Sequence, residues 1–142
     1  MIIYVDTSAA MKLLIEESES SVLADFLEQS RSAASDTLVA SLLLHTELHC
    51  AANQRSTDIR PESVAEVLSA IALVDLESGD LTTAPLLPCR LQSADAIHLA
   101  TALRVDARAM VVYDSELQAA AKTAGIAVVS PTGLVPPGPA RQ

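Results

Sequence analysis

The chain has 142 residues, half of them apolar, which is enough for one domain with a sizeable core. One Phe, two Tyr and no Trp argue against an aromatic stacking platform for single-stranded nucleic acid. The 18 acidic and 9 basic residues indicate a soluble surface and disfavour a simple basic nucleic-acid binder, although bound cations would still let such a protein act on phosphates.

The first half of the chain predicts three strands separated by helices. Residues 2–6 are an apolar run with β-branched content that ends in an acid, which predicts a short buried strand, and a short helix is expected over residues 8–15. A second helix is predicted to open at Ser18 or Glu19, before a second strand over residues 37–40. Ser41 is placed to cap the next helix, Pro61 suits the first turn of another, and residues 71–76 predict a third strand.

The second half continues the alternation after an irregular segment. Residues 77–91 contain Gly79, Pro85 and Pro88, which predicts broken helix or loop. Ser93 is expected to cap a helix over residues 94–105. Strands are predicted over residues 109–113 and 126–130, with a helix over residues 115–123 that ends at Gly125. We divide the chain into a domain over residues 1–132 and a Pro-rich tail over residues 133–142.

Strands that alternate with helices predict an α/β protein. The expected architecture is a three-layer α/β/α fold with a mostly parallel central sheet of about five strands. Ligands bind such sheets at the carboxyl ends of the strands. Asp6 and Asp114 each end a predicted strand, so both are expected at this rim.

The two isolated cysteines and the N-terminal sequence indicate the expected cellular location of the protein. Cys50 and Cys89 have no CxxC spacing, so we expect reduced core residues of a cytoplasmic protein. The N-terminus lacks a signal-peptide pattern, and no apolar run is long enough to span a membrane.

Four acids lie in apolar surroundings: Asp6, Glu47, Asp95 and Asp114. Each has a simpler explanation, since Asp6 and Asp114 could cap helices, Asp95 could face a helix dipole and Glu47 could lie on a helix flank. Together, however, they favour a cluster, and neighbouring carboxylates stay ionised together only around a cation. We therefore expect bound Mg²⁺, with Mn²⁺ as an alternative.

A carboxylate-held Mg²⁺ with open positions suits hydrolysis of a phosphodiester. Thr7 and Ser8 are candidates for orienting a carboxylate or a metal-bound water, and helix capping is their alternative role. His45 and His49 are four residues apart but do not form the HExxH pattern, so a zinc site is disfavoured. His98 is expected to be a structural histidine that bonds backbone or a neighbouring acid.

Four stretches in this order carry a resemblance to a known family: VDTSA, HTELHC, SADAIHLATAL and VVYDSEL. They resemble the PIN-domain ribonucleases and, within them, the VapC-type toxins of bacterial toxin–antitoxin pairs. The resemblance spans about residues 1–132, and the DAIHLATAL block is its most specific part.

The resemblance implies a metal-dependent endoribonuclease, the toxin of a type II toxin–antitoxin system. Asp6, Glu47, Asp95 and Asp114 would then form the acidic pocket, with Asp6 and Asp95 as the main Mg²⁺ ligands. It also implies a homodimer, a structured RNA such as tRNA or rRNA as substrate, and a VapB-like antitoxin as inhibitor.

The chain departs from the family pattern at several positions. Val112 stands where many relatives carry a threonine, and His49 and Cys50 stand where many relatives carry a basic residue. Glu116 takes the neighbourhood of a further aspartate found in some relatives and is a possible substitute for it. Without the four pocket acids the net charge is −9 + 4 = −5, so RNA needs local basic contacts. The candidates are Lys12, Arg55, Arg60, Arg90 and Arg104, with ordinary solvated side chains as the alternative.

Three other functions compete with the nuclease. A phosphoacceptor receiver domain would carry a lysine before Pro131, where Ser130 stands. A phosphatase of the haloacid dehalogenase type would have a second aspartate at Ser8. A non-catalytic PIN module that only binds partners is the third alternative, although all four acids are present.

Overall fold

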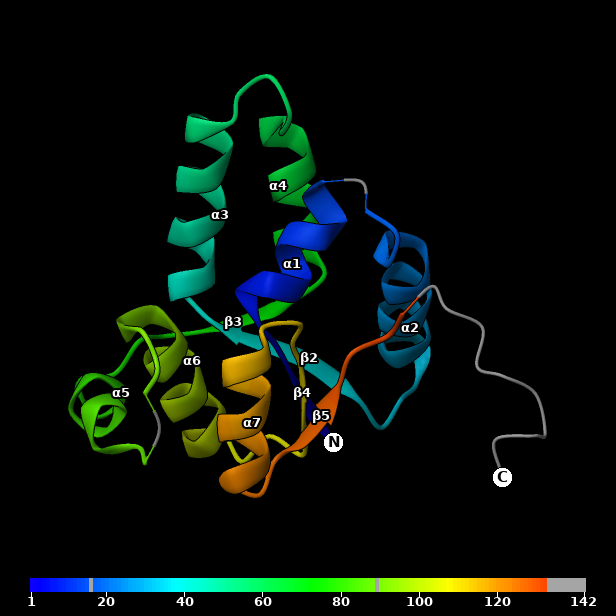
Figure 1. Ribbon diagram of the computed structural model, residues 1–142. Helices are drawn as coiled ribbons and strands as arrows, with labels where there is room; N and C mark the ends of the chain where they lie inside the picture. Colours follow the sequence, from blue (N-terminus) through cyan, green and yellow to red (C-terminus); the bar gives the residue numbers. More distant parts are fainter. Residues whose placement is uncertain (16, 89, 133–142) are drawn as a thin grey trace.

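The computed structural model describes residues 1–15, 17–88 and 90–132 (Figure 1). Cys89 and the predicted Pro-rich tail over residues 133–142 lie outside the described residues. Strands and helices alternate along the chain. In order they are β1 (Ile2–Val5), α1 (Thr7–Leu14), α2 (Ser20–Ser32), β2 (Thr37–Ser41), α3 (Leu43–Gln54), α4 (Pro61–Ser69), β3 (Ala72–Val74), α5 (Ser78–Thr83), a 3₁₀ helix (Ala84–Leu86), α6 (Ser93–Arg104), β4 (Ala109–Val111), α7 (Ser115–Thr123) and β5 (Ala127–Val129).

The sheet has five strands in the order β3-β2-β1-β4-β5, and all of them are parallel. The chain winds from β1 outward to β3 and then returns past β1 to β4 and β5. Because parallel crossovers are right-handed, α1–α4 cover one face and α5–α7 cover the other, and Figure 1 shows these two groups apart. The predicted α/β/α fold is confirmed, and the winding reverses between β1 and β4, where open sheets of this kind bind ligands.

The core is aliphatic, as the composition predicts. The three central strands β2, β1 and β4 are buried along most of their length. Ala9 and Ala10 of α1 and Ala102 of α6 are also buried, and such small side chains let helices approach the sheet closely. Leu44 and Leu48 anchor α3, and burying each contributes about 1.5–3 kcal/mol.

The predicted helix ends are partly confirmed. Gly125 ends α7 with φ of 90°, and the bonds of Gly125 N–H to Lys122 and of Ile126 N–H to Ala121 complete a Schellman turn. The broken helix predicted over residues 77–91 is α5 with its 3₁₀ extension. The predicted cap at Ser93 is wrong, because Gln92 is the extended residue before α6 and Ser93 is already helical.

Two further observations concern the surface. Cys50 is a free thiol, as expected, but it is exposed rather than buried in the core. Among the described helices, none is both long and apolar enough to cross a bilayer.

Candidate active site

Asp6 follows β1 directly, and its side chain is buried at the rim of the sheet with an exposed fraction of 1%. Its Oδ2 accepts hydrogen bonds from the Ser8 backbone N–H at 3.0 Å and from the Ser8 hydroxyl at 2.7 Å. The capping role considered for Asp6 is therefore real. Its Oδ1 is buried and has no hydrogen-bond partner within the described ranges. A buried carboxylate oxygen in this state is costly, and a cation or an ordered water would satisfy it.

Ser8 joins two segments of the rim. Its hydroxyl donates to Asp6 and accepts a hydrogen bond from the backbone N–H of Tyr113 at 2.9 Å. The backbone N–H of Asp6 itself donates to the carbonyl of Val111 in β4 at 3.0 Å. The end of β1 is thereby bonded to the segment that leads from β4 to Asp114.

Glu47 reaches the rim from α3 and meets Thr7 of α1 and His98 of α6. Its Oε1 accepts a hydrogen bond from the Thr7 hydroxyl at 2.7 Å and lies 2.5 Å from Nε2 of His98. Burial acts to raise the pKa of Glu47, but the hydrogen bonds and charge of His98 and the bond from Thr7 outweigh it and hold this pKa below its usual range. Glu47 is thus an ionised group, and His98 bonds a neighbouring acid as expected.

Asp95 lies in the first turn of α6 and is the acid whose protonation the site perturbs most clearly. Burial, followed by the charges of Asp6 and Asp114, raises its pKa from 3.8 to about 6, and Glu47 adds to the rise. His98 opposes this effect. The charges of the three other predicted acids therefore all act to raise the pKa of Asp95.

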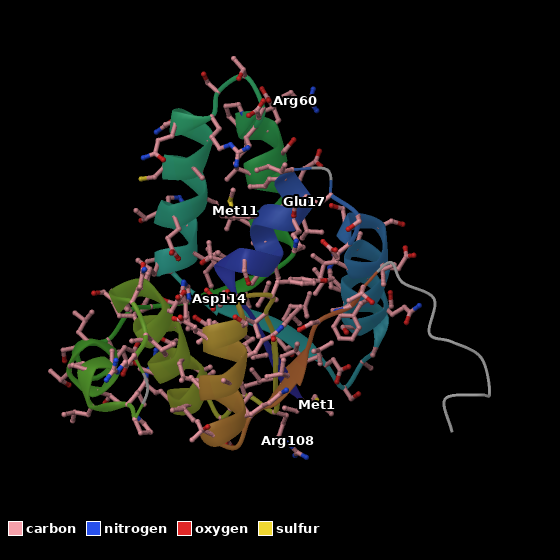
Figure 2. All side chains as sticks on the ribbon, viewed as in Figure 1. Met1, Met11, Glu17, Arg60, Arg108 and Asp114 are labelled. Atoms are coloured by element: carbon pink, nitrogen blue, oxygen red, sulfur yellow. The ribbon has the colours of Figure 1, made fainter. Side chains whose placement is uncertain are left out.

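Asp114 caps α7, the structural role that we considered for it. Its Oδ1 accepts hydrogen bonds from the backbone N–H groups of Glu116 at 2.8 Å and Leu117 at 3.0 Å. Figure 2 shows Asp114 at the end of α7 nearest to α1. Glu116 is exposed in the first turn of α7, and only its backbone N–H takes part in this arrangement.

The donor set fits a divalent cation only in part. Among the described residues, no three His, Cys, Asp or Glu side chains are close enough to form a metal site on their own. Two carboxylates suffice for Mg²⁺, however, because waters and substrate phosphates complete its coordination. The unpaired oxygen of Asp6 and the like-charge environment of Asp95 are features that such an ion would relieve.

The basic candidates differ in how they are engaged. Lys12 binds Glu17 and Glu19 at 2.8 Å each and lies over the Tyr113 ring, and Arg104 binds Asp80 and Glu77. Arg55 has a longer contact of 3.6 Å with Asp58. Over the part of the chain that is described, Arg60 and Arg90 form no ion pair, and both are exposed. The charges of Lys12 and Arg104 are therefore already engaged in ion pairs within the fold.

Tyr4 is a site residue that the sequence analysis missed. Its hydroxyl lies 2.7 Å from Nδ1 of His98, 94 residues away in the chain. A tyrosine inside an otherwise apolar strand is itself a signal, because a buried phenol usually has a hydrogen-bond partner. The partner cannot be identified from local sequence, since the contact is made across the fold.

Comparisons with known proteins agree with this geometry. The family model for the PIN domain matches residues 3–123. Ribonuclease VapC46 from Mycobacterium tuberculosis is 35% identical over 133 residues, which cover 92% of this chain and 98% of the relative. Ribonuclease VapC35 from the same species is 36% identical over 134 residues, covering 91% and 96%.

Solved structures share the fold at low sequence identity. VapBC2 from Rickettsia felis, bound to a DNA fragment from its promoter, matches with a TM-score of 0.71 and 12% identity over 91% of this chain and 98% of that chain. VapC20 from M. tuberculosis, a toxin that cleaves the sarcin–ricin loop, matches with a TM-score of 0.64 and 15% identity over 83% and 94%. With the family model and the curated relatives, these matches show that the chain belongs to the PIN-domain family, within which it is homologous to the VapC ribonuclease toxins of VapBC toxin–antitoxin systems.

Proposed function

We propose that this chain is a metal-dependent endoribonuclease that hydrolyses RNA phosphodiester bonds at the acidic rim and acts as the toxin of a type II toxin–antitoxin system. We assign the activity to residues 1–132. The observation that carries the proposal is the buried, unpaired Oδ1 of Asp6 in the same charged environment as Asp95, whose pKa its neighbours raise.

Each rim residue has a role in this proposal. Asp6 and Asp95 would hold Mg²⁺, or Mn²⁺, which when bound polarises the phosphoryl oxygen and helps to ionise an attacking water. Ser8 orients Asp6 through its two bonds to Oδ2. Thr7 orients Glu47. Glu47 and Asp114 would complete the pocket through bound waters, and the exposed Glu116 is an outer candidate.

The partners follow from the family and remain proposals for this chain. The substrate would be a structured RNA such as tRNA or rRNA, met in the cytoplasm. Among the five basic candidates, Arg60 and Arg90 are the two without an ion pair in the described part of the chain and are proposed to bind its phosphates. A VapB-like antitoxin would inhibit the enzyme, which would act as a homodimer. Fold neighbours that were solved as toxin–antitoxin complexes support the antitoxin.

The sharpest test uses Asp95→Asn. This change removes a proposed ligand while relieving charge repulsion, and urea unfolding of the same variant separates lost activity from lost stability. We expect the wild type to cut total tRNA or rRNA with Mg²⁺ or Mn²⁺ and to stop in EDTA, and we expect Asp95→Asn to be inactive. Asp25→Asn, at an exposed carboxylate of α2, is the matched control and should cut normally.

The alternative is a non-catalytic PIN module that only binds partners. Under that alternative, Asp6→Ala and Asp95→Asn would both keep partner binding, and the wild type would cut no RNA in the panel. Absence of any metal-dependent cleavage by well-folded wild type would therefore reject the enzyme and favour the module.

A further inference from the structure

A hydrogen-bonded chain runs beneath the rim from β2 through β1 and α6 to α3. The backbone N–H of Ser41 donates to the Tyr4 hydroxyl at 2.9 Å, and this hydroxyl lies 2.7 Å from Nδ1 of His98. Nε2 of the same ring lies 2.5 Å from Oε1 of Glu47. Tyr4 and His98 are both fully buried, so water does not compete for these contacts.

The proton positions in this chain follow from its fixed ends. Ser41 N–H is a donor, so it occupies a lone pair of the Tyr4 oxygen. The Oε1 of Glu47 is an acceptor, because it receives the hydrogen bond of the Thr7 hydroxyl at 2.7 Å. In a neutral imidazole one nitrogen donates and the other accepts. Every atom finds a partner only when the Tyr4 hydroxyl donates to Nδ1 and Nε2–H donates to Glu47.

The reverse tautomer leaves two faults. With a proton on Nδ1, whether the ring is neutral or doubly protonated, the ring would donate to the Tyr4 oxygen, and the Tyr4 hydroxyl proton would lose its acceptor at a fully buried position. In the neutral ring the bare Nε2 would also face a carboxylate oxygen at 2.5 Å, and the Thr7 hydroxyl, 3.0 Å from Nε2, could donate to it only by leaving Glu47. Leaving a buried donor unpaired is costly, so the Nε2–H tautomer dominates.

We propose that Tyr4 is a positioning residue that fixes the tautomer of His98, so that His98 and Thr7 together anchor Oε1 of Glu47 and leave Oε2 to face the pocket. This inference rests on the proposed function for its effect on metal binding, but the tautomer itself does not depend on it. Tyr4 touches neither substrate nor metal in this arrangement. It acts through His98 on the orientation of one carboxylate of the rim.

The first measurement is the tautomer of His98 by long-range ¹H–¹⁵N NMR. In the wild type we expect a protonated Nε2 and an unprotonated Nδ1 with neutral-ring shifts. Because the Glu47 carboxylate also favours a proton on Nε2, the role of Tyr4 is measured in a Glu47→Gln background: there the Tyr4 hydroxyl should still hold the proton on Nε2, and adding Tyr4→Phe should give a mixture of tautomers. Tyr113→Phe removes the only other phenol in the chain and should leave the His98 signals unchanged. A wild-type ring protonated on Nδ1 would overturn the proposal.

The second measurement is a double-mutant cycle on metal affinity, with Mn²⁺ as the titrant in calorimetry. Loss of a hydrogen-bond partner of a metal ligand typically weakens a metal site 10–100-fold, and Tyr4 acts at one remove through His98 and Glu47, so Tyr4→Phe should bind Mn²⁺ more weakly by up to about tenfold. In a Glu47→Gln background the same change should have almost no further effect, since Tyr4 acts through Glu47. A merely structural Tyr4 would weaken binding by the same factor in both backgrounds, which would refute the positioning role.

The two measurements also separate this inference from the proposed function. If the wild type binds no Mn²⁺ and cuts no RNA, the enzyme proposal fails, and NMR still decides the tautomer. If the wild type binds Mn²⁺ and cuts RNA while Tyr4→Phe changes neither the tautomer in the Glu47→Gln background nor the affinity of the wild type, the enzyme stands and the role of Tyr4 is rejected.

Discussion

Replacing Asp95 with asparagine should stabilise the metal-free protein at neutral pH, even though it removes a proposed ligand. The folded-state pKa of Asp95 is about 6, against an ordinary value of 3.8. Between these values the folded state binds more protons than the unfolded state. The free energy of unfolding therefore falls as pH rises through this window, and above it the wild type carries the whole penalty.

The size of the effect follows from the same two values. A rise from 3.8 to about 6 would correspond to about 3 kcal/mol for an unscreened group, but Asp95 is only partly buried, and solvent screening leaves about 1–2 kcal/mol between pH 4 and pH 8. The assay is urea unfolding of wild type and Asp95→Asn at both pH values in EDTA. The stability difference between the two proteins should grow by about 1–2 kcal/mol at pH 8, and pH-independent effects of the amide cancel.

Two controls sharpen this experiment. Asp25→Asn, on the exposed face of α2, should differ from wild type equally at both pH values. Mg²⁺ at about a hundred times its dissociation constant should stabilise the wild type by about 2.7 kcal/mol and Asp95→Asn hardly at all. If the difference between wild type and Asp95→Asn is the same at pH 4 and pH 8, the carboxylates do not crowd one another and the reasoning for a shared site is refuted.

Three further changes test the supporting structure by urea unfolding. Asp80→Asn should lower the free energy of unfolding by about 2–3 kcal/mol, because Asp80 is buried and bonds Arg104 through both oxygens. The exposed control Asp58→Asn should lower it by less than about 0.5 kcal/mol. Equal losses would contradict the buried pair. Asp114→Ala should lose about 1 kcal/mol with the cap of α7, and Asp114→Ser should recover most of that stability while remaining inactive on RNA; an active serine variant would remove Asp114 from the pocket. Gly125→Ala should cost about 1 kcal/mol from its positive φ alone, since nothing lies within 4 Å of an added Cβ, and an unchanged midpoint would count against that conformation.

Most helices and strands were predictable because their signals are local. Pro61 opens α4 and Gly125 follows α7, as the conformational preferences of these residues require. The cap predicted at Ser93 is wrong because the cap position depends on which residue is extended, and the backbone of Gln92 has ψ of 159°. Residue type alone does not distinguish these two neighbouring positions.

The strand ends around the candidate site were predictable, but the side-chain contacts there were not. Parallel strands end at one edge, and β1 and β4, which lead to Asp6 and Asp114, are neighbours in the sheet. The engagement of Arg104 with Asp80 and the contact of Tyr4 with His98 depend on tertiary packing that no local pattern encodes. The distances between the acids also depend on tertiary packing. The charges of the other acids raise the pKa of Asp95, but among the described residues no three ligating side chains are close enough to form a metal site on their own.

The central place of β1 also affects how the protein is made. A nascent chain that has emerged only to residue 74 holds β1, β2 and β3, but β1 still lacks its neighbour β4. The Val111 carbonyl that receives the N–H of Asp6 has not yet emerged, nor have Asp95 and Asp114. Because translation proceeds from the N-terminus, the four acids are all outside the ribosome only when the chain is nearly finished. Under the proposed function, the ribosome that makes this chain would therefore complete most of its work before the product could cut RNA.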